Sequence, residues 1–175
     1  MKIDTLGNVR RNSAVFVALF ATALTMGGAL AHLLELPAKI RMPAEEYLVV
    51  QQLYFGWYRL AYLIGVQVFS IVLSAFLVRT DARALRPMLI ALGCVLAAQA
   101  VFWTLTYPAN VATANWTMLP DDWEPLRSRW EYSHALGALF QTAAMASLIV
   151  AALTRVRRAS RRESSVSHDY ARTGA

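Results

Sequence analysis

Two pairs of ionisable side chains, His32 with Glu35 and Glu131 with His134, are the residues of this chain best suited to chemistry. The members of each pair are three residues apart, so on a helix they lie one turn apart on a single face. Imidazole can act as a base near neutral pH and can bind metal ions. Both pairs stand in long apolar stretches, where ionisable groups are costly and normally face a bundle interior or a wet cavity. The spacing predicts a polar site shared by two helices.

The apolar stretches that hold these pairs are long enough to cross a lipid bilayer. The 175 residues are 57% hydrophobic and 16% charged, whereas about 25% of a soluble domain is charged. Four runs approach the ~20 residues that span a ~30 Å hydrocarbon layer. We expect helices over about 14–36, 43–78, 87–107 and 121–158, in a membrane domain over residues 14–158. The sequence predicts an all-α integral membrane protein, an antiparallel four-helix bundle whose second and fourth helices form a small outer ledge.

Basic residues predict the orientation of this bundle. The N-terminal tail (1–13), the second loop and the C-terminal region carry three, three and six of the 17 Lys and Arg. By the positive-inside rule both termini are cytoplasmic, and the first and third loops face outward. We therefore expect a multi-pass protein of the cell membrane, a bacterial inner membrane. Residues 159–175 are polar and rich in Ser and Arg, which is typical of a disordered tail.

Two other readings of the termini and the charge are weaker. The first run follows Lys2, Arg10 and Arg11 and ends near a small-residue stretch over 29–31, as in a cleaved signal peptide. It is long for such a peptide, so we expect a retained helix. The net charge of +6 reflects topology, and no basic face with interleaved aromatic residues is present, so no nucleic-acid partner is expected. The partners expected are the lipid bilayer and a lipophilic small molecule, and a protein partner stays unspecified.

All four predicted helices bring polar or aromatic side chains to the outer end of the bundle. The candidate catalytic residues are His32, His134, Arg127 and Asn110, and the candidate substrate-binding residues are Trp116, Trp130, Tyr107, Tyr54 and Trp57. Arg127, Trp130 and His134 follow an i, i+3, i+7 spacing and share one helix face. These residues predict an outward-facing polar pocket.

Structural roles for the same residues stay open. Each histidine can be a packing residue at the membrane edge, and Trp57 an interface anchor. Glu35 with Lys39, and Arg127 with Glu131, have the spacing of i, i+4 ion pairs. Three membrane glutamines are expected to hydrogen-bond between helices, namely Gln67, Gln99 and Gln141.

Metal and haem binding also stay open as alternatives. His32, His134 and one carboxylate form a reasonable ligand set for a single metal ion. Two histidines from different helices can also ligate a haem. A di-iron centre needs further inward carboxylates that this chain lacks. We therefore assign no metal ligands, and the cofactor is left unspecified.

The stretch from Tyr107 to His134 resembles a family of small four-helix membrane proteins that is catalogued as a domain of unknown function and includes the fungal anthrone oxygenases. The matching pattern consists of Pro108, Asn110, Trp116, Trp123, Arg127, Trp130 and His134. "AHLLELPAKI" and "QQLYFGW" look like a bacterial branch of that family, and the resemblance extends over about residues 14–155. One position departs from the pattern, because many members carry an arginine where this chain has Leu136.

The resemblance implies an oxygenase that oxidises an acidic aromatic methylene with molecular oxygen, through a base-generated carbanion that needs no cofactor. His134 or His32 would be the base. Arg127 and Asn110 would stabilise the enolate oxygen. The sequence thus predicts an oxygenase or oxidoreductase for a lipophilic aromatic or quinone-like substrate. The alternatives are a non-catalytic binding or accessory protein and a His-ligated metal or haem electron carrier.

Overall fold

The computed structural model describes the backbone of residues 2–173 and the side chains of residues 6–155. The regular elements in this part are all helical. They are α1 (Lys2–Lys39), α2 (Ala44–Gln51), the 3-10 helices η1 (Gln52–Tyr54) and η2 (Trp57–Arg59), α3 (Leu60–Leu77), α4 (Ala82–Val101), the π-helix η3 (Phe102–Thr106), α5 (Tyr107–Ala112) and α6 (Trp123–Thr173). The tail expected over 159–175 lies outside the residues whose side chains are described.

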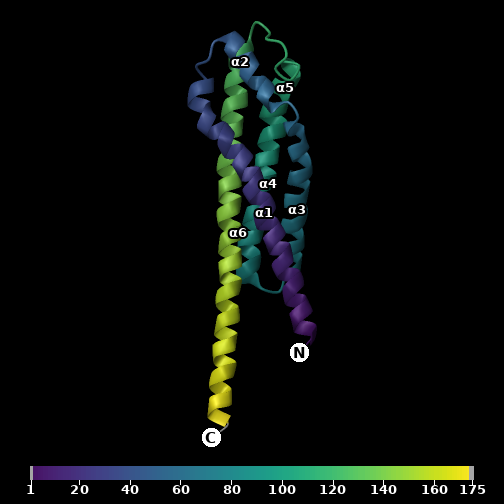
Figure 1. Ribbon diagram of the computed structural model, residues 1–175, viewed down its shortest axis with the longest axis vertical. Helices are drawn as coiled ribbons and strands as arrows, with labels where there is room; N and C mark the ends of the chain where they lie inside the picture. Colours follow the sequence, from purple (N-terminus) through teal and green to yellow (C-terminus); the bar gives the residue numbers. More distant parts are fainter. Residues whose placement is uncertain (1, 174–175) are drawn as a thin grey trace.

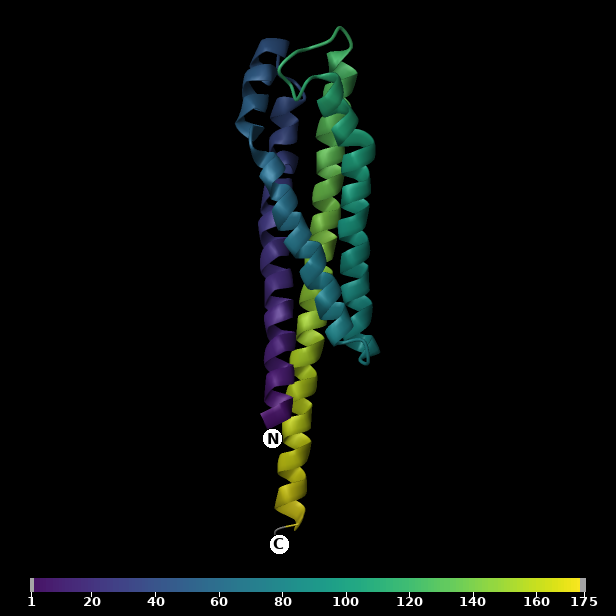
Figure 2. The same cartoon turned by 90° about the vertical axis from the view of Figure 1, so that its right-hand side faces the viewer.

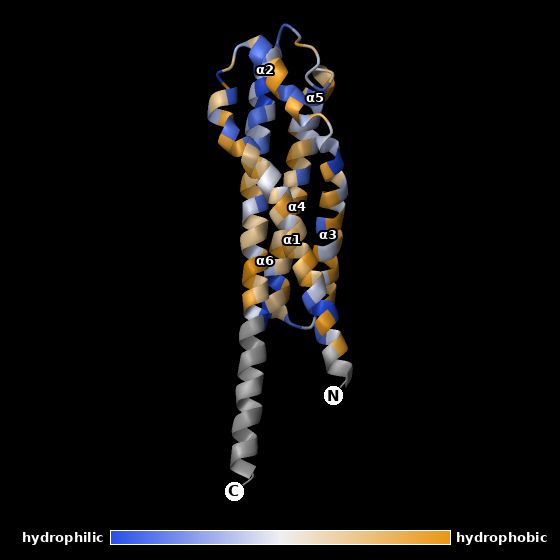
Figure 3. Cartoon of the chain, viewed as in Figure 1, coloured by the Kyte–Doolittle hydropathy of each residue, from blue (hydrophilic) through white to orange (hydrophobic). Residues whose placement is uncertain are grey.

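Figures 1 and 2 show α1, α3, α4 and α6 side by side along the long axis, with the chain turning back at each connection and α2 and α5 at one end. Four segments are long and apolar enough to cross a membrane: Leu6–Lys39, Trp57–Leu77, Ala82–Ala112 and Trp123–Arg155. In Figure 3 the middle of these helices is largely apolar and the α2 end is more polar. Large apolar side chains such as Phe16, Phe69 and Ile90 are more than half exposed. Such a surface fits contact with lipid, as in a membrane protein.

Small and polar residues hold the centre of the bundle together. Ala18, Ala91 and Ala144 are fully buried where the helices approach closely. Gln67 of α3 donates from Nε2 to Thr22 Oγ1 on α1 at 3.1 Å and to Gln141 Oε1 on α6 at 2.8 Å. The interhelical roles predicted for these two glutamines are therefore confirmed.

The predicted single helix over 43–78 is wrong, because the chain breaks at Gly56. Gly56 has a φ of 92°, in the left-handed region that a residue without Cβ adopts at little cost. The break separates α2 and η1 from η2 and α3. The segment before the break, α2 and η1 (residues 44–54), forms a ledge that folds over the end of the bundle. The break also brings Tyr54 and Trp57 together, with ring centroids 5.0 Å apart.

The first and third membrane helices extend beyond their predicted bounds. α1 continues through Pro37 to Lys39, because one proline removes only one hydrogen bond of a long packed helix. α4 begins at Ala82, where the Asp81 side chain accepts a hydrogen bond from the Arg83 amide. The helix then widens into the π-turns of η3 just before Pro108. A π-turn accommodates a proline ring that would meet the carbonyl four residues earlier.

Replacing Gly56 with alanine is expected to destabilise the protein by about 1–2 kcal/mol, because an L-residue is strained at a positive φ. The added Cβ would also lie 3.3 Å from the Arg59 guanidinium. Unfolding midpoints in detergent measure the change. Gly93→Ala is the matched control, since a Cβ on Gly93 meets nothing within 4 Å and alanine is the better helix former. Equal midpoints for the two variants would contradict a strained turn.

Candidate functional site

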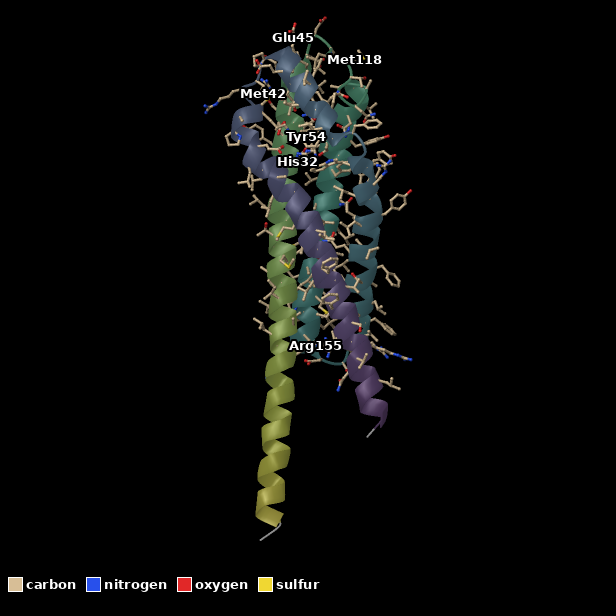
Figure 4. The ribbon with its side chains drawn as sticks, in the orientation of Figure 1. His32, Met42, Glu45, Tyr54, Met118 and Arg155 are labelled. Atoms are coloured by element: carbon tan, nitrogen blue, oxygen red, sulfur yellow. The ribbon has the colours of Figure 1, made fainter. Side chains whose placement is uncertain are left out.

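His32 of α1 and His134 of α6 face each other at the end of the bundle where α2 and α5 lie. Their ring centroids are 4.3 Å apart, and the ring planes are inclined by 49°. His32 is buried. Figure 4 shows His32 and Tyr54 close together at this end and Arg155 at the opposite end. The two histidines that the sequence placed at one depth are direct neighbours.

Three large aromatic rings surround the histidine pair. The ring centroid of Trp130 lies 3.9 Å from that of His134 and 5.1 Å from that of His32. Tyr54 of η1 and Trp57 of η2, on either side of the break at Gly56, approach His32 to 4.6 and 5.1 Å. Aromatic side chains from two parts of the chain thus line the space around His32.

The hydrogen bonds of the pair determine which ring nitrogens can react. His134 Nδ1 lies 2.8 Å from the Trp130 carbonyl oxygen. A carbonyl only accepts, so Nδ1 carries the proton and Nε2 keeps a lone pair. His32 Nδ1 is buried and has no hydrogen-bond partner. Buried polar atoms usually have a hydrogen-bond partner, so this nitrogen remains available to a donor or an acceptor.

A buried ion pair lies next to the histidines. Lys39 Nζ is 2.9 Å from Glu131 Oε1, and both side chains are at most 2% exposed. The Tyr47 hydroxyl donates to the same carboxylate oxygen at 2.9 Å. The Lys39 ammonium also lies 4.4 Å from the centroid of the Trp130 ring, a cation–π distance. Lys39 is therefore the cation closest to the aromatic rings that enclose the histidine pair.

A chain of hydrogen bonds leads from this ion pair to the surface. Lys39 Nζ donates to the Tyr54 oxygen at 3.0 Å, and the Tyr54 hydroxyl donates to Glu35, whose side chain is 44% exposed. The predicted ion pair of Glu35 with Lys39 is present at 3.9 Å. Burial raises the pKa of the Tyr54 phenol, and so does its hydrogen bond to Glu35. Burial and the nearby Glu131 likewise raise the pKa of Tyr47, so both phenols remain proton donors.

Arg127 joins the ledge to α6 and does not pair with Glu131. Its Nη1 donates to the Met42 carbonyl at 2.7 Å, and its guanidinium lies 4.5 Å from the centroid of the Trp123 ring. Glu131 pairs with Lys39 instead. The side chain predicted to stabilise an enolate therefore holds the connection between α1 and α2.

Asn110 connects two tryptophans of the predicted set. Its Oδ1 accepts from Trp116 Nε1 at 3.2 Å and from Trp130 Nε1 at 2.8 Å. Trp116 packs edge-on against Trp130, with the ring centroids 6.1 Å apart. Tyr107 is 46% exposed and packs against Trp103. Asn110 and Trp116 therefore hold the Trp130 ring in place. Tyr107 packs away from the histidine pair, against Trp103.

The loop that carries Trp116 is strained. Residues 114–116 have φ values of 48°, 57° and 61°, although none is glycine. Each such residue costs about 1–2 kcal/mol, so the surrounding contacts must hold the turn. The Trp116 amide donates to Thr113 Oγ1 at 3.1 Å, and Gln52 of the ledge donates to the Trp116 carbonyl at 2.8 Å. The turn buries the Trp116 ring and fastens the loop to the ledge.

The site does not offer a ready metal or haem centre. Among residues with described side chains, no three His, Cys, Asp or Glu converge as metal ligands. Two metal–nitrogen bonds of about 2 Å would put the ligating nitrogens about 4 Å apart and the ring centres farther still. The ring centroids of His32 and His134 are only 4.3 Å apart. An iron atom does not fit between rings so placed.

The structure brings together five of the nine predicted residues, namely His32, Tyr54, Trp57, Trp130 and His134. Lys39 and Tyr47 belong to the group but were missed. Lys39 follows His32 by seven residues, which puts both on one face of α1. That spacing was the available signal, and ending the helix before Pro37 concealed it. No comparable signal marks Tyr47, which reaches Glu131 only because the ledge folds over the bundle.

Comparisons of the chain with protein-family models, curated proteins and solved structures found no match.

Replacing Asn110 with leucine is expected to cost about 2–4 kcal/mol of folding stability, since two indole N–H groups lose their acceptor at about 1–3 kcal/mol each. Asn110→Asp keeps an acceptor oxygen and is the matched control. Chemical denaturation in detergent, followed by tryptophan fluorescence, measures both. If the leucine variant unfolds at the same denaturant concentration as the aspartate variant, Asn110 is not the connection described.

Proposed function

We propose that the chain is an antiparallel four-helix bundle of the cell membrane, with both termini in the cytoplasm. The positive-inside rule supports this orientation, because Arg155 lies at the end opposite the ledge, where it binds the Arg11 carbonyl and the Asn12 side chain of α1. The histidine site then lies near the outer surface. A lipophilic molecule in the outer leaflet can reach that depth from the bilayer.

We further propose that the histidine site oxidises a lipophilic aromatic molecule, such as an anthrone or a hydroquinone, with molecular oxygen. One observation carries the proposal. Buried His32 and half-buried His134, from different helices, meet among aromatic rings, and His32 Nδ1 has no hydrogen-bond partner there. Flat aromatic faces suit a flat aromatic substrate, and an imidazole with a free nitrogen suits proton removal.

The proposed reaction begins with transfer of a proton from an acidic methylene to His134 Nε2. The carbanion reduces molecular oxygen and combines with it as a peroxide. Loss of water then leaves one oxygen atom on the carbon as a carbonyl, while the second leaves as water with the two hydrogens of the methylene. Oxygen is the oxidant, and no other electron acceptor is needed. His134 is suited to the first step because its Nδ1 is bound to the Trp130 carbonyl.

Stabilisation of the enolate oxygen is assigned to Lys39. Its ammonium group lies against the rings of Trp130 and Tyr54, both of which touch His32. Arg127 is committed to the Met42 carbonyl. A preorganised cation beside developing negative charge is the usual source of such stabilisation.

Substrate entry requires movement of the ledge, because Tyr54 and Trp57 occupy the space beside His32. These residues flank Gly56, where the left-handed backbone separates the ledge from η2 and α3. A change of backbone angle at Gly56 moves Tyr54 relative to Trp57 and so opens the space beside His32. Lids of this kind admit substrate and then exclude water.

Oxygen uptake by the purified full chain tests the oxygenase proposal. A panel of anthrones and hydroquinones is added to protein in lipid nanodiscs, and oxygen consumption is followed with an electrode. We expect uptake above the uncatalysed rate for at least one substrate, and for an anthrone one carbonyl formed per oxygen molecule consumed. Uptake no faster than in empty nanodiscs for the whole panel overturns the proposal.

A non-catalytic role is the second candidate, and the contacts among the site residues support it. Tyr54, Trp57 and Trp130 pack against His32, while Lys39 binds both Tyr54 and Glu131, and Tyr47 donates to Glu131. In that case the group serves to fasten the ledge to α1 and α6. The non-catalytic role is favoured if no substrate increases oxygen uptake and if substitutions of Lys39, Tyr47, Tyr54 or Glu131 strongly destabilise the protein.

A further inference from the structure

A long groove runs between α1 and α3, in the half of the bundle away from the histidine site. It has a volume of about 880 Å³. Figure 2 shows the two helices diverging toward the end opposite α2, which opens the groove. Its walls are mostly apolar and include Val9, Val17, Tyr62, Val66, Phe69 and Leu73. Each of these side chains is at least 36% exposed, so the groove is open to the surroundings.

The groove carries a positive charge near one end. Among the side chains that the structure describes, Arg10 is the only charged one that lines it, and it lies toward the N-terminal end of α1. No acidic side chain lines this part of the described chain. A partner that fills the groove must therefore combine a long apolar body with one anionic group.

We propose that this groove binds an anionic phospholipid, with its phosphate at Arg10 and an acyl chain along α3. From Tyr62 to Leu77 the groove follows 15 residues of helix, about 22 Å, which exceeds the roughly 15 Å depth of one leaflet. The Arg10 end is cytoplasmic in the proposed orientation, and the cytoplasmic leaflet is the one rich in anionic lipid. The lipid site uses none of the residues of the histidine site, so either proposal can fail alone.

A second copy of the chain fits this groove less well. Two copies that obey the positive-inside rule have the same orientation in the membrane. The two-fold axis of a dimer then lies along the membrane normal, and residues at the same depth face each other. Arg10 of one copy would then face Arg10 of the other, and like charges repel in a poorly hydrated contact. A phospholipid brings the opposite charge to the same place.

Native mass spectrometry of the full chain tests the site, with phosphatidylglycerol and phosphatidylcholine of identical acyl chains as probes. Arg10→Gln is expected to reduce the preference for phosphatidylglycerol about fivefold, the effect of one basic residue at a membrane surface. The matched control is Arg83→Gln, because Arg83 is exposed at the same end but does not line the groove. An equal reduction in both variants overturns the assignment of the phosphate to Arg10.

A second pair of variants tests the apolar part of the groove. Gly65 lines it, and a Cβ there meets nothing within 4 Å, so Gly65→Leu fills the groove without strain. We expect this variant to lose retained lipid of both kinds, whereas Gly93→Leu on α4, equally open, keeps it. Inorganic phosphate should leave the bound lipid in place. Displacement by phosphate alone, unchanged retention in Gly65→Leu, or a dimer that Gly65→Leu converts to a monomer would each overturn the phospholipid site.

Discussion

Replacing Lys39 with methionine is expected to lower the free energy of unfolding by about 3–5 kcal/mol, because Glu131 is then left charged and buried. Glu131 is fully buried, and Lys39 supplies its ion pair at 2.9 Å. The Tyr47 hydroxyl remains bound to the carboxylate but provides only a neutral donor. One neutral hydrogen bond does not compensate for the lost charge. The variant should therefore unfold at a much lower denaturant concentration in detergent.

The double variant Lys39→Met with Glu131→Leu separates the cost of an orphaned charge from the value of the pair. Replacing both partners of a buried pair with apolar residues is often neutral or stabilising, so most of the lost stability should return. Arg41→Met is the matched control, since Arg41 is an exposed cation two residues further on and such changes stay within about 0.5 kcal/mol. A double variant as unstable as Lys39→Met would show that Lys39 acts by packing and not by neutralising Glu131.

The helical fold of the described chain and its four helices long and apolar enough to span a membrane were predictable, because they depend on local composition. A run of about 20 apolar residues predicts a spanning helix without knowledge of its neighbours. Helix ends were harder. Gly56 gives no local sign of a positive φ inside an apolar run, and that conformation depends on how the ledge packs against α1. Pro37 gave the opposite error, because packing keeps α1 helical beyond it.

The positions of the site residues were predictable where helix periodicity determines which way a side chain points. They were not predictable where packing of the ledge determines its contacts. His32 and His134 were placed at one depth from their positions in two helices, and the structure pairs them. Glu131, in contrast, was expected beside His134 or in an ion pair with Arg127. Glu131 turns instead to Lys39 and Tyr47, which reach it from α1 and the ledge. Contacts between α6 and the ledge depend on tertiary packing that no residue spacing encodes.

The cation at the histidine site is Lys39 and not Arg127, again because tertiary packing overrides what helix periodicity predicts. Arg127 shares a helix face with Trp130 and His134, so periodicity favoured it. In the folded chain its guanidinium binds the Met42 carbonyl, a backbone atom in the connection between α1 and α2. Lys39 gains its position because α1 extends past Pro37. A helix that ended at residue 36 would have left the buried Glu131 without a cation.

Replacing His134 with phenylalanine is expected to reduce the rate of oxygen uptake by at least 100-fold on whichever substrate supports it. A positioned general base contributes about 10²–10⁴-fold to rate, and phenylalanine removes the nitrogen that takes the proton. An aromatic ring is kept, so the tilted ring contacts with Trp130 (centroids 3.9 Å apart) and with His32 (centroids 4.3 Å apart) are preserved. Stability should therefore change little, and the loss should appear in kcat.

Two companion variants make the assignment of the base specific. Thr142→Val lies two turns further along the exposed face of α6, where Thr142 bonds only its own helix, and it should leave turnover unchanged. His134→Ala leaves a space of imidazole size, so added imidazole should restore part of the activity if the missing group is a base. Turnover in His134→Phe within twofold of the unmodified chain would exclude His134 as the base. Proton removal would then pass to His32, whose Nδ1 lacks a partner, and His32→Phe would show the larger loss.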